Sequence, residues 1–238
     1  MHYFSICLDL SGKICIVIGG GKVAERKVQG LLACGAGVTV ISPELTEALR
    51  ELAAAERINL IQRPYEEGDL LGAFLVIAAT DEPQVQRKVH EEAARANLLL
   101  NVADVPELCN FILPATLRRG DLAVAVSTGG KSPALARRIR ERLDEIFPPE
   151  YEEYVTLLGL LRPFILQRHL SHQENKKIFQ SLLHDTMIDW IRLQEWDKIK
   201  SHIEKFAGSE AAAICVDTLA GVRNDAATAT DKLPLNSA

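Results

Sequence analysis

Short apolar runs alternate with helical patterns from Lys13 to Val102, and this alternation restricts the chain to one class of fold. The apolar runs read KICIVI, GVTVIS, INLIQ, AFLVIAAT and LLLNVAD, and helical patterns such as those at 23–33 and 83–96 separate most of them. Runs of this length predict about five strands. Strands that are apolar on both faces need helices on both sides, which is typical of a parallel sheet. We therefore expect an α/β protein with a doubly wound parallel sheet.

A glycine-rich turn follows the first predicted strand directly. Gly19, Gly21 and Ala24 stand at the spacing of the G-x-G-x-x-G/A motif. In this motif the first glycine permits a tight turn, the second lets a pyrophosphate approach the backbone, and the third small residue allows a helix to pack closely on the sheet. The N–H groups at Lys22 and Val23, where the helix starts, would face the anion. The turn thus predicts a Rossmann-type dinucleotide site; the alternative is a glycine turn without a ligand.

The end of the second strand departs from the usual dinucleotide pattern. An acid about 20 residues after the glycines usually binds the ribose hydroxyls, whereas this strand ends in Ser42, Pro43 and Glu44. We expect Ser42 or backbone groups to bind the ribose, with Glu44 as the alternative ligand. No arginine stands beside this position to accept a 2′-phosphate, so NAD is favoured over NADP. Thr80, after the fourth strand, is expected on the ligand side of the sheet, and Asp81 is expected to cap the next helix.

The pattern changes beyond Asp104. FILPATL and LAVAVST flank the sequence RRGD, which predicts a hairpin. Ser132 and Pro133 are typical of a helix start, and the two prolines at 148–149 end that helix. The periodicity is helical from there to Phe206, whereas the last segment has no aromatic side chain and can bury little. We predict a nucleotide-binding domain over 1–110, a hairpin–helix segment over 111–147, a helical domain over 148–207 and a disordered tail over 208–238.

Charge and cysteine content exclude several classes of protein. The net charge of −5 argues against nucleic acid as the main partner, because neutralising phosphates requires a basic surface. Five cysteines without a CxxC pair indicate neither a disulfide framework nor a zinc cluster. No apolar run approaches the roughly 20 residues of a membrane-spanning helix, and the start MHYFSICLDLSGK lacks the pattern of a secretion signal. We expect a cytoplasmic protein that is not bound to a membrane.

Several motifs together resemble one known family. LDLSGKICIVIGGGKVAERK, GAGVTVISPE, VIAATDEPQVQ, NVAD and STGGKSPALARRIRERL follow one another in this order. The combination closely resembles precorrin-2 dehydrogenase, the sirohaem-pathway enzyme that also forms the front module of sirohaem synthase, over residues 3–147. This resemblance implies NAD-dependent oxidation of precorrin-2 to sirohydrochlorin. Some members of the family also insert ferrous iron to give sirohaem, and the sequence leaves open whether this chain does so.

The resemblance also implies a catalytic role for Asp104, which stands where the family has its essential aspartate. Asp104 comes two residues after the fifth strand, in the crevice outside the carboxyl ends of the sheet. Loss of a hydride from a reduced tetrapyrrole also requires loss of a proton, which a nearby carboxylate can accept. Because Asp104 lies close to Pro106, a role as a turn-former is the alternative.

The stretch STGGKSP is expected to bind the substrate. Thr128 occupies the position of a family serine or threonine near the tetrapyrrole pocket, and Ser132 lies where a helix N-terminus can accept a carboxylate. Precorrin-2 is a polycarboxylate, and Lys131 and Arg138 are the cations that we expect to bind it. The alternative is a capped helix after a glycine turn. The resemblance further implies that this middle segment joins two chains in a homodimer.

We expect no metal site in the protein itself. His169 and His172 have a spacing that permits shared coordination, but Ser171 is typical of a helix cap and no acid nearby completes a ligand set. Cys109 is interpreted as a half-buried structural cysteine. Ferrous iron would be a substrate, held by Asp104 and the nitrogens of the macrocycle.

Two further expectations concern partners and alternatives. A separate uroporphyrinogen-III methyltransferase must supply precorrin-2, because this chain shows no such module. The rival hypothesis is a non-catalytic NAD-sensing regulatory domain, in which ligand occupancy shifts a conformational equilibrium. The missing acid after the second strand and the sequence STGGKSPALARR both count against that rival.

Overall fold

The computed structural model describes residues 3–184 and 186–230, and the chain divides into two compact units. The first unit extends to Pro114 and includes Thr128–Ser132; the second contains Ala115–Ser127 and the chain from Pro133 onward. The predicted hairpin–helix segment over 111–147 therefore does not form a separate compact unit. Its hairpin and helix group with the helices that follow, because the hairpin packs on both α4 and α5.

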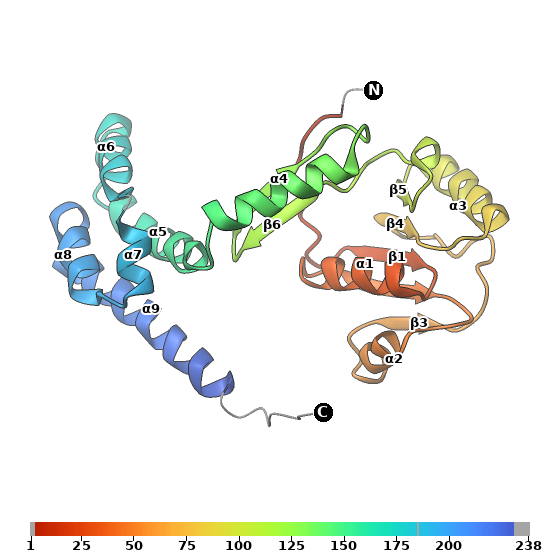
Figure 1. Ribbon diagram of the computed structural model, residues 1–238, viewed down its shortest axis with the longest axis horizontal. Coiled ribbons are helices and arrows are strands. Elements are labelled where there is room, and N and C mark those ends of the chain that lie inside the picture. The colour runs from red at the N-terminus through yellow and green to blue at the C-terminus, as the bar shows by residue number, and fades with distance from the viewer. Residues whose placement is uncertain (1–2, 185, 231–238) are drawn as a thin grey trace. The chain divides into compact units, whose positions relative to one another are not determined.

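The first unit contains a parallel sheet that confirms the predicted fold class. Among the described residues five strands pair in the order β3-β2-β1-β4-β5, all of them parallel. The strands are β1 (Ile14–Ile18), β2 (Gly37–Ile41), β3 (Asn59–Ile61), β4 (Leu75–Ala78) and β5 (Leu99–Val102). The helices are α1 (Lys22–Leu32), α2 (Glu47–Ala54) and α3 (Pro83–Arg95), with a short 3-10 turn at Pro106–Leu108. Figure 1 shows them around the sheet.

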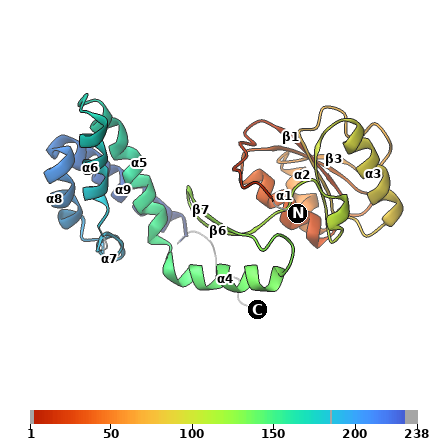
Figure 2. The same cartoon turned by 90° about the horizontal axis from the view of Figure 1, so that it is seen from above.

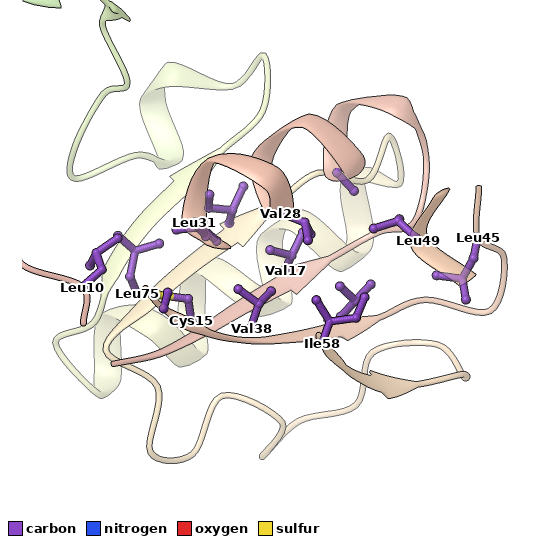
Figure 3. Close-up of a cluster of buried hydrophobic side chains, with 14 residues drawn as sticks. Leu10, Cys15, Val17, Val28, Leu31, Val38, Leu45, Leu49, Ile58 and Leu75 are labelled. Atoms are coloured by element: carbon purple, nitrogen blue, oxygen red, sulfur yellow. The ribbon is translucent and has the colours of Figure 1, made fainter. Parts of the chain in front are cut away.

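Strand residues alternate between two hydrophobic clusters, one on each face of the sheet. On one face Val17 of β1 packs in a cluster with Val28 of α1 and Leu49 of α2, as Figure 3 shows. On the other face Ile16 of β1 packs in a cluster with Val89 of α3. Because both faces are covered, the central strands are apolar throughout, as the sequence pattern requires.

The strand order creates a switch point between β1 and β4. From β1 the chain moves outward to β2 and then β3, and it returns to the other side of β1 to form β4 and then β5. The connections from the carboxyl ends of β1 and β4 therefore leave toward opposite faces and open a crevice, which is where ligands bind in such sheets.

The second unit begins with a hairpin that packs on helices. Strands β6 (Ala115–Arg119) and β7 (Leu122–Val126) are antiparallel and joined by Gly120 and Asp121. Gly120 has a φ of +55°, which glycine adopts without steric cost. Helix α4 (Pro133–Ile146) begins at the predicted proline and packs on both strands, and Arg119 donates a hydrogen bond to the carbonyl of Phe147 at 2.8 Å. Since the hairpin also packs on the next helix, these elements form one body with the helical region.

The remaining elements of the second unit form a helical bundle, visible in Figure 2. They are α5 (Glu150–Leu166), α6 (His172–Leu182), α7 (Met187–Arg192), α8 (Trp196–Ala207) and α9 (Ser209–Thr230). The expectation of a disordered tail from residue 208 is wrong over 209–230. Although this segment lacks aromatic residues, small and aliphatic side chains such as Ala212, Val216 and Leu219 are buried against α5 and α8. Residues 231–238 lie outside the described residues.

The structure also bears on two smaller expectations, which concern the cap of α3 and membrane-spanning helices. The N-cap of α3 is Glu82, whose side chain makes no capping bond, so the prediction that Asp81 caps this helix is wrong. Pro83 in the first position needs no amide partner, which reduces the need for a cap. Among residues 3–184 and 186–230, no helix is both long enough and apolar enough to traverse a bilayer.

The packing of α9 predicts an unequal response to two neighbouring substitutions. Val216→Asp places a carboxylate at a side chain that is 3% exposed, and we expect it to lower the free energy of unfolding of the second unit by about 3 kcal/mol. Asp217→Asn, on the exposed side of α9, should change it by less than about 0.5 kcal/mol. Both tryptophans, Trp190 and Trp196, lie in this unit, so tryptophan fluorescence during urea denaturation reports its unfolding. Equal stability of the two variants would show that α9 does not dock.

Candidate functional site

The glycine turn joins β1 to α1 at the carboxyl edge of the sheet. Gly21 is the N-cap of α1 and has no side chain to cap it, so the first amides of the helix have no side-chain acceptor there. A Cβ at Gly21 would meet no atom within 4 Å, which means that the backbone here faces open space. Exposed amides combined with the positive end of the helix dipole favour an anion at this point.

Neighbouring backbone lies so close to positions 19 and 20 that only glycine fits at either one. Gly19 has a φ of +115°, and a Cβ there would lie 2.3 Å from the carbonyl oxygen of Ala79. A Cβ at Gly20 would lie 2.0 Å from the carbonyl oxygen of Glu44. The G-x-G-x-x-G/A motif treats the middle position as free, so Gly20 is a required residue that the motif alone did not identify.

The segment after β2 supports the turn and supplies the residues expected near the ribose. Ser42 is buried and donates a hydrogen bond to the carbonyl of Glu44 at 2.7 Å. The amide of Thr46 donates to the carbonyl of Gly20 at 2.9 Å. The hydroxyl proton of Ser42 is thus used within the loop, so this oxygen is left with acceptor capacity only, whereas the Glu44 side chain is exposed.

A cavity of about 1070 Å³ lies at this edge, at the upper end of the range for small-molecule sites. All of its lining residues belong to the first unit. The structure brings together there the sequence-predicted residues Gly19, Gly21, Lys22, Val23, Ser42, Pro43, Glu44, Thr80 and Asp104.

Lys22 carries a positive charge at the start of α1. Its ammonium lies 2.9 Å from a carboxylate oxygen of Glu25, three residues further along the helix. This ammonium, together with the hydroxyl of Thr46, lowers the pKa of Glu25. Glu25 therefore stays ionised, and part of the Lys22 charge is already compensated within the helix.

A tyrosine that sequence reasoning did not single out forms part of the cavity wall. Tyr65 hydrogen-bonds to the carboxylate of Glu92, which also accepts the amides of Gly68 and Leu70 at 3.0 Å each. Burial, followed by the hydrogen bond to Glu92, raises the pKa of Tyr65. The phenol therefore stays protonated and acts as a fixed donor that holds the loop after β3 against the cavity.

Thr80 is held on the opposite wall. Its hydroxyl accepts the amide of Glu82 at 3.3 Å, and its carbonyl accepts the side-chain amide of the buried Gln86 at 2.7 Å. The turn after β4 is thus tied to the first turns of α3, and the wall that Thr80 forms is rigid.

Asp104 occupies a constrained position on the turn after β5. Its φ is +61°, in the left-handed region that few residues other than glycine, asparagine and aspartate enter readily. The amide of the preceding residue, Ala103, donates to the carbonyl of Ala78 at the end of β4 at 2.8 Å. Unusual backbone held in place beside a cavity is a feature of functional sites.

Cys109 holds the turn that presents Asp104. Its thiol accepts the amide of Val102 at 3.1 Å and lies 3.3 Å from the Val102 carbonyl and 3.4 Å from that of Val105. Burial raises the pKa of Cys109, so the group stays a neutral thiol. The next residue, Asn110, accepts the amide of Leu100 at 2.8 Å. A structural role for Cys109 agrees with its interpretation from the sequence.

The residues expected to bind the substrate lie outside the lining of this cavity. The hydroxyl of Thr128 accepts the amide of Ser132 at 3.0 Å, so the glycine turn before α4 is internally braced. Lys131 is exposed in the same turn. On α4, Arg137 and Arg140 pair with acids of their own helix, whereas Arg138 has no hydrogen bond or ion pair within the described residues. The substrate roles of Thr128, Lys131, Ser132 and Arg138 stay predictions.

The described residues contain no group of three or more His, Cys, Asp and Glu side chains that could hold a metal ion. Ser171 caps α6 in a reciprocal arrangement with Glu174, as the sequence indicated. His172 is the first residue of that helix, and His169 lies in the turn before it with a φ of +51°.

Comparisons with known proteins identify two matching family models. Residues 6–115 match the model of an NAD(P)-binding family, and residues 119–146 match that of the central part of sirohaem biosynthesis proteins. The protein named siroheme synthase in Methylobacillus flagellatus is 39% identical over 192 residues, which cover 79% of this chain and 41% of the relative. Its counterpart in Nitrosococcus oceani is 36% identical over 204 residues, covering 86% and 44% respectively. The chain thus spans about two fifths of the length of the curated relatives it matches.

One solved structure matches this chain over the whole length of the solved protein. The protein described as SirC, precorrin-2 dehydrogenase, superposes with a TM-score of 0.72 and is 29% identical. The match covers 86% of this chain and 100% of that one.

The contacts of the glycine turn predict opposite effects for two glycine-to-alanine substitutions. Gly20→Ala forces the turn away from the Glu44 carbonyl, and we expect it to lower the free energy of unfolding of the first unit by about 2 kcal/mol. Gly30→Ala, at an exposed position inside α1 with no atom within 4 Å of the new Cβ, should raise it by about 0.5–1 kcal/mol. Denaturation followed by circular dichroism measures both. If Gly20→Ala were as stable as Gly30→Ala, the close approach to Glu44 would be incorrect.

Proposed function

Because this chain belongs to the family of precorrin-2 dehydrogenase, which includes the corresponding part of sirohaem synthases, we propose that it oxidises precorrin-2 to sirohydrochlorin with NAD. The observation that carries the proposal is the joint location of the glycine turn and Asp104 at one cavity. A dinucleotide-binding turn and a carboxylate able to accept a proton are the two components that such an oxidation needs.

The residues at the cavity fit a dinucleotide. The backbone at Gly21 faces open space, and the uncapped start of α1 offers amides to a pyrophosphate. We propose that Ser42, Pro43 and Glu44 bind the adenosine ribose and that Thr80 lies along the cofactor. When bound there, NAD supplies a hydride acceptor.

The proposed reaction removes one hydride and one proton from precorrin-2. Bound NAD would supply the acceptor for the hydride, while the carboxylate of Asp104 accepts the proton from the substrate and later releases it to water. The turn held by Cys109 fixes the backbone from which the carboxylate extends, and general-base catalysis requires a well-placed base.

Ferrous iron enters the proposal as a second substrate. The names of the relatives include siroheme synthase, and a carboxylate beside the macrocycle can accept the pyrrole N–H protons that a metal ion displaces. The same Asp104 would serve both reactions, so the measurement of iron insertion belongs in the first experiment.

The proposal includes three features beyond the reaction itself. Lys131 and Arg138 bind carboxylates of the tetrapyrrole, and Thr128 and Ser132 shape the turn that receives it. A uroporphyrinogen-III methyltransferase supplies precorrin-2. The enzyme works in the cytoplasm, where its five cysteines, all free in the structure, stay reduced.

We also propose that the enzyme is a homodimer formed through the hairpin and α4. Leu135, Ile139 and Ile146 share one face of α4 and are 50%, 36% and 60% exposed. Apolar side chains grouped in this way on a helix beside an exposed strand edge favour association with a second chain.

The decisive experiment is anaerobic incubation of the protein with enzymatically prepared precorrin-2 and NAD⁺. NADH formation at 340 nm, accompanied by the spectrum of sirohydrochlorin, is the expected result. Ferrous ion is then added, and the rate of sirohaem formation is compared with the rate without protein. An absence of NAD-dependent oxidation would favour the alternative of a regulatory NAD-binding domain.

Substitution of Asp104 should separate turnover from cofactor binding. Asp104→Ala removes the proton acceptor, and we expect kcat to fall by about 100-fold or more with the affinity for NAD unchanged. Steady-state kinetics and calorimetric titration with NAD measure the two quantities. Loss of both together would indicate that Asp104 only maintains the turn.

Substitution of Gly21 should have the opposite profile. Gly21→Asp places a negative side chain in the open space before α1, where the pyrophosphate is expected, and NAD binding should weaken by at least about 100-fold through repulsion and blocked approach. Thermal stability should change little, because no protein atom lies near the new Cβ. Undiminished NAD affinity would overturn the assignment of the cofactor site.

A further inference from the structure

His90 is a half-buried side chain of α3 that contacts the turn after β5. Its Nδ1 atom lies 3.1 Å from the carbonyl oxygen of Leu108, in the 3-10 turn that follows Asp104. A carbonyl oxygen can only accept a hydrogen bond, so this contact assigns the ring proton to Nδ1, which donates to Leu108. His90 therefore ties the turn that carries Asp104 to a helix packed on the sheet.

The position of the Asp104 carboxylate depends on the backbone of this turn. Within the described ranges 3–184 and 186–230 its side chain makes no hydrogen bond or ion pair. Its φ of +61° persists where the surrounding structure holds it. The amide of Leu108 donates to the carbonyl of Val105 at 3.1 Å, and Val105 adjoins Asp104 and lines the cavity. A bond to the Leu108 carbonyl thus restrains the short segment from which the carboxylate extends.

Apolar side chains also pack this turn against α3. Val105 and Leu108 pack against the cluster that contains the buried Val89 of α3. Apolar packing is non-directional, whereas a hydrogen bond fixes both a distance and an angle. His90, which follows Val89, therefore supplies the directional part of the contact between the helix and the turn.

The same face of α3 holds a second wall of the cavity. Gln86 is buried, lines the cavity and donates a hydrogen bond to the carbonyl of Thr80 at 2.7 Å. Residues four apart in a helix share a face, as Gln86 and His90 do. Because β4 and β5 are adjacent strands, these two bonds attach the loops at neighbouring strand ends to one helix. One turn of α3 thus sets the spacing between the loop beside the proposed NAD site and the turn that carries the proposed proton acceptor.

We propose that His90 is a positioning residue for the proton transfer: by bonding the Leu108 carbonyl from α3, it holds Asp104 where its carboxylate meets the substrate. This inference rests on the proposed function. In the step itself the proton moves from the substrate to Asp104, and His90 keeps its Nδ1 proton throughout. A displacement of about 1 Å can lower a rate by about 100-fold, so a contact that holds the turn in place acts on kcat.

The kinetic test compares three substitutions. His90→Phe keeps a planar ring and removes the donor, whereas His90→Asn keeps an N–H donor two bonds from Cβ, as Nδ1 is. Lys88→Phe adds the same ring at an exposed position of α3 outside the cavity lining, as a matched control. We expect His90→Phe to lower kcat by about tenfold with KM for NAD unchanged, and the other two variants to stay within about twofold of the wild type.

A double substitution tests whether His90 acts through Asp104. In the Asp104→Ala background, His90→Phe should cause no further loss of kcat, because the group that it positions is already absent. Additive losses would contradict the inference, as would an unchanged kcat in His90→Phe alone. Equal losses in His90→Asn and His90→Phe would show that the donor is not what matters. A matching loss of NAD affinity in His90→Phe would make the role of His90 one of cofactor binding instead.

A second measurement does not depend on the substrate. Hydrogen–deuterium exchange, followed by mass spectrometry of peptides covering 103–110, reports opening of the turn, because the amides of Leu108 and Cys109 are bonded within it. Exchange there should be at least about threefold faster in His90→Phe than in the wild type and His90→Asn, and unchanged over β1. Equal exchange in His90→Phe and the wild type would overturn the anchoring. If exchange changed as expected but the wild type did not oxidise precorrin-2, the failure would lie with the proposed function.

Discussion

The close approach of three backbone segments at the carboxyl edge of the sheet is the constraint on which the site depends. The turn after β1 contacts the end of β4 through Gly19 and the end of β2 through Gly20, with no space for a side chain at either contact. Hydrogen bonds from Gly19 to the Ile41 carbonyl and from Thr46 to the Gly20 carbonyl, both 2.9 Å, hold the segments together. Because these contacts are between backbones, they fix the start of α1 and hence the direction of its free amides.

The electrostatics of the site follow from this arrangement. The protein is acidic overall, yet the start of α1 presents amides, Lys22 and the positive end of the helix dipole to the cavity. A cofactor with a pyrophosphate can therefore bind despite a net charge of −5. On the other side of the cavity, the left-handed turn at Asp104 presents a carboxylate, and the neutral thiol of Cys109 bonds the backbone of that turn.

The second unit depends on the packing of helices around a hydrophobic core. The core of α5, α7 and α8 is completed by α9, whose small residues permit close helix contact. Composition alone suggested that this segment could bury little. The reasoning failed because small side chains such as alanine and valine are buried where α9 packs on α5 and α8. The hairpin packs on both α4 and α5, so a boundary drawn from the change of periodicity near residue 148 does not separate it from the helices.

The sequence by itself determined the features that depend on local patterns. Strand period, the glycine spacing and the proline that begins α4 are encoded in neighbouring residues, and for this reason the sheet, the phosphate-binding turn and the positions of Ser42, Glu44, Thr80 and Asp104 at one edge were predictable. Only the tertiary structure decided which residues meet across the chain. The contact of Gly20 with Glu44, the tyrosine at position 65 in the cavity wall and the docking of α9 all join residues that are distant in sequence. No local pattern specifies such pairs, because they form only when separate elements pack against one another.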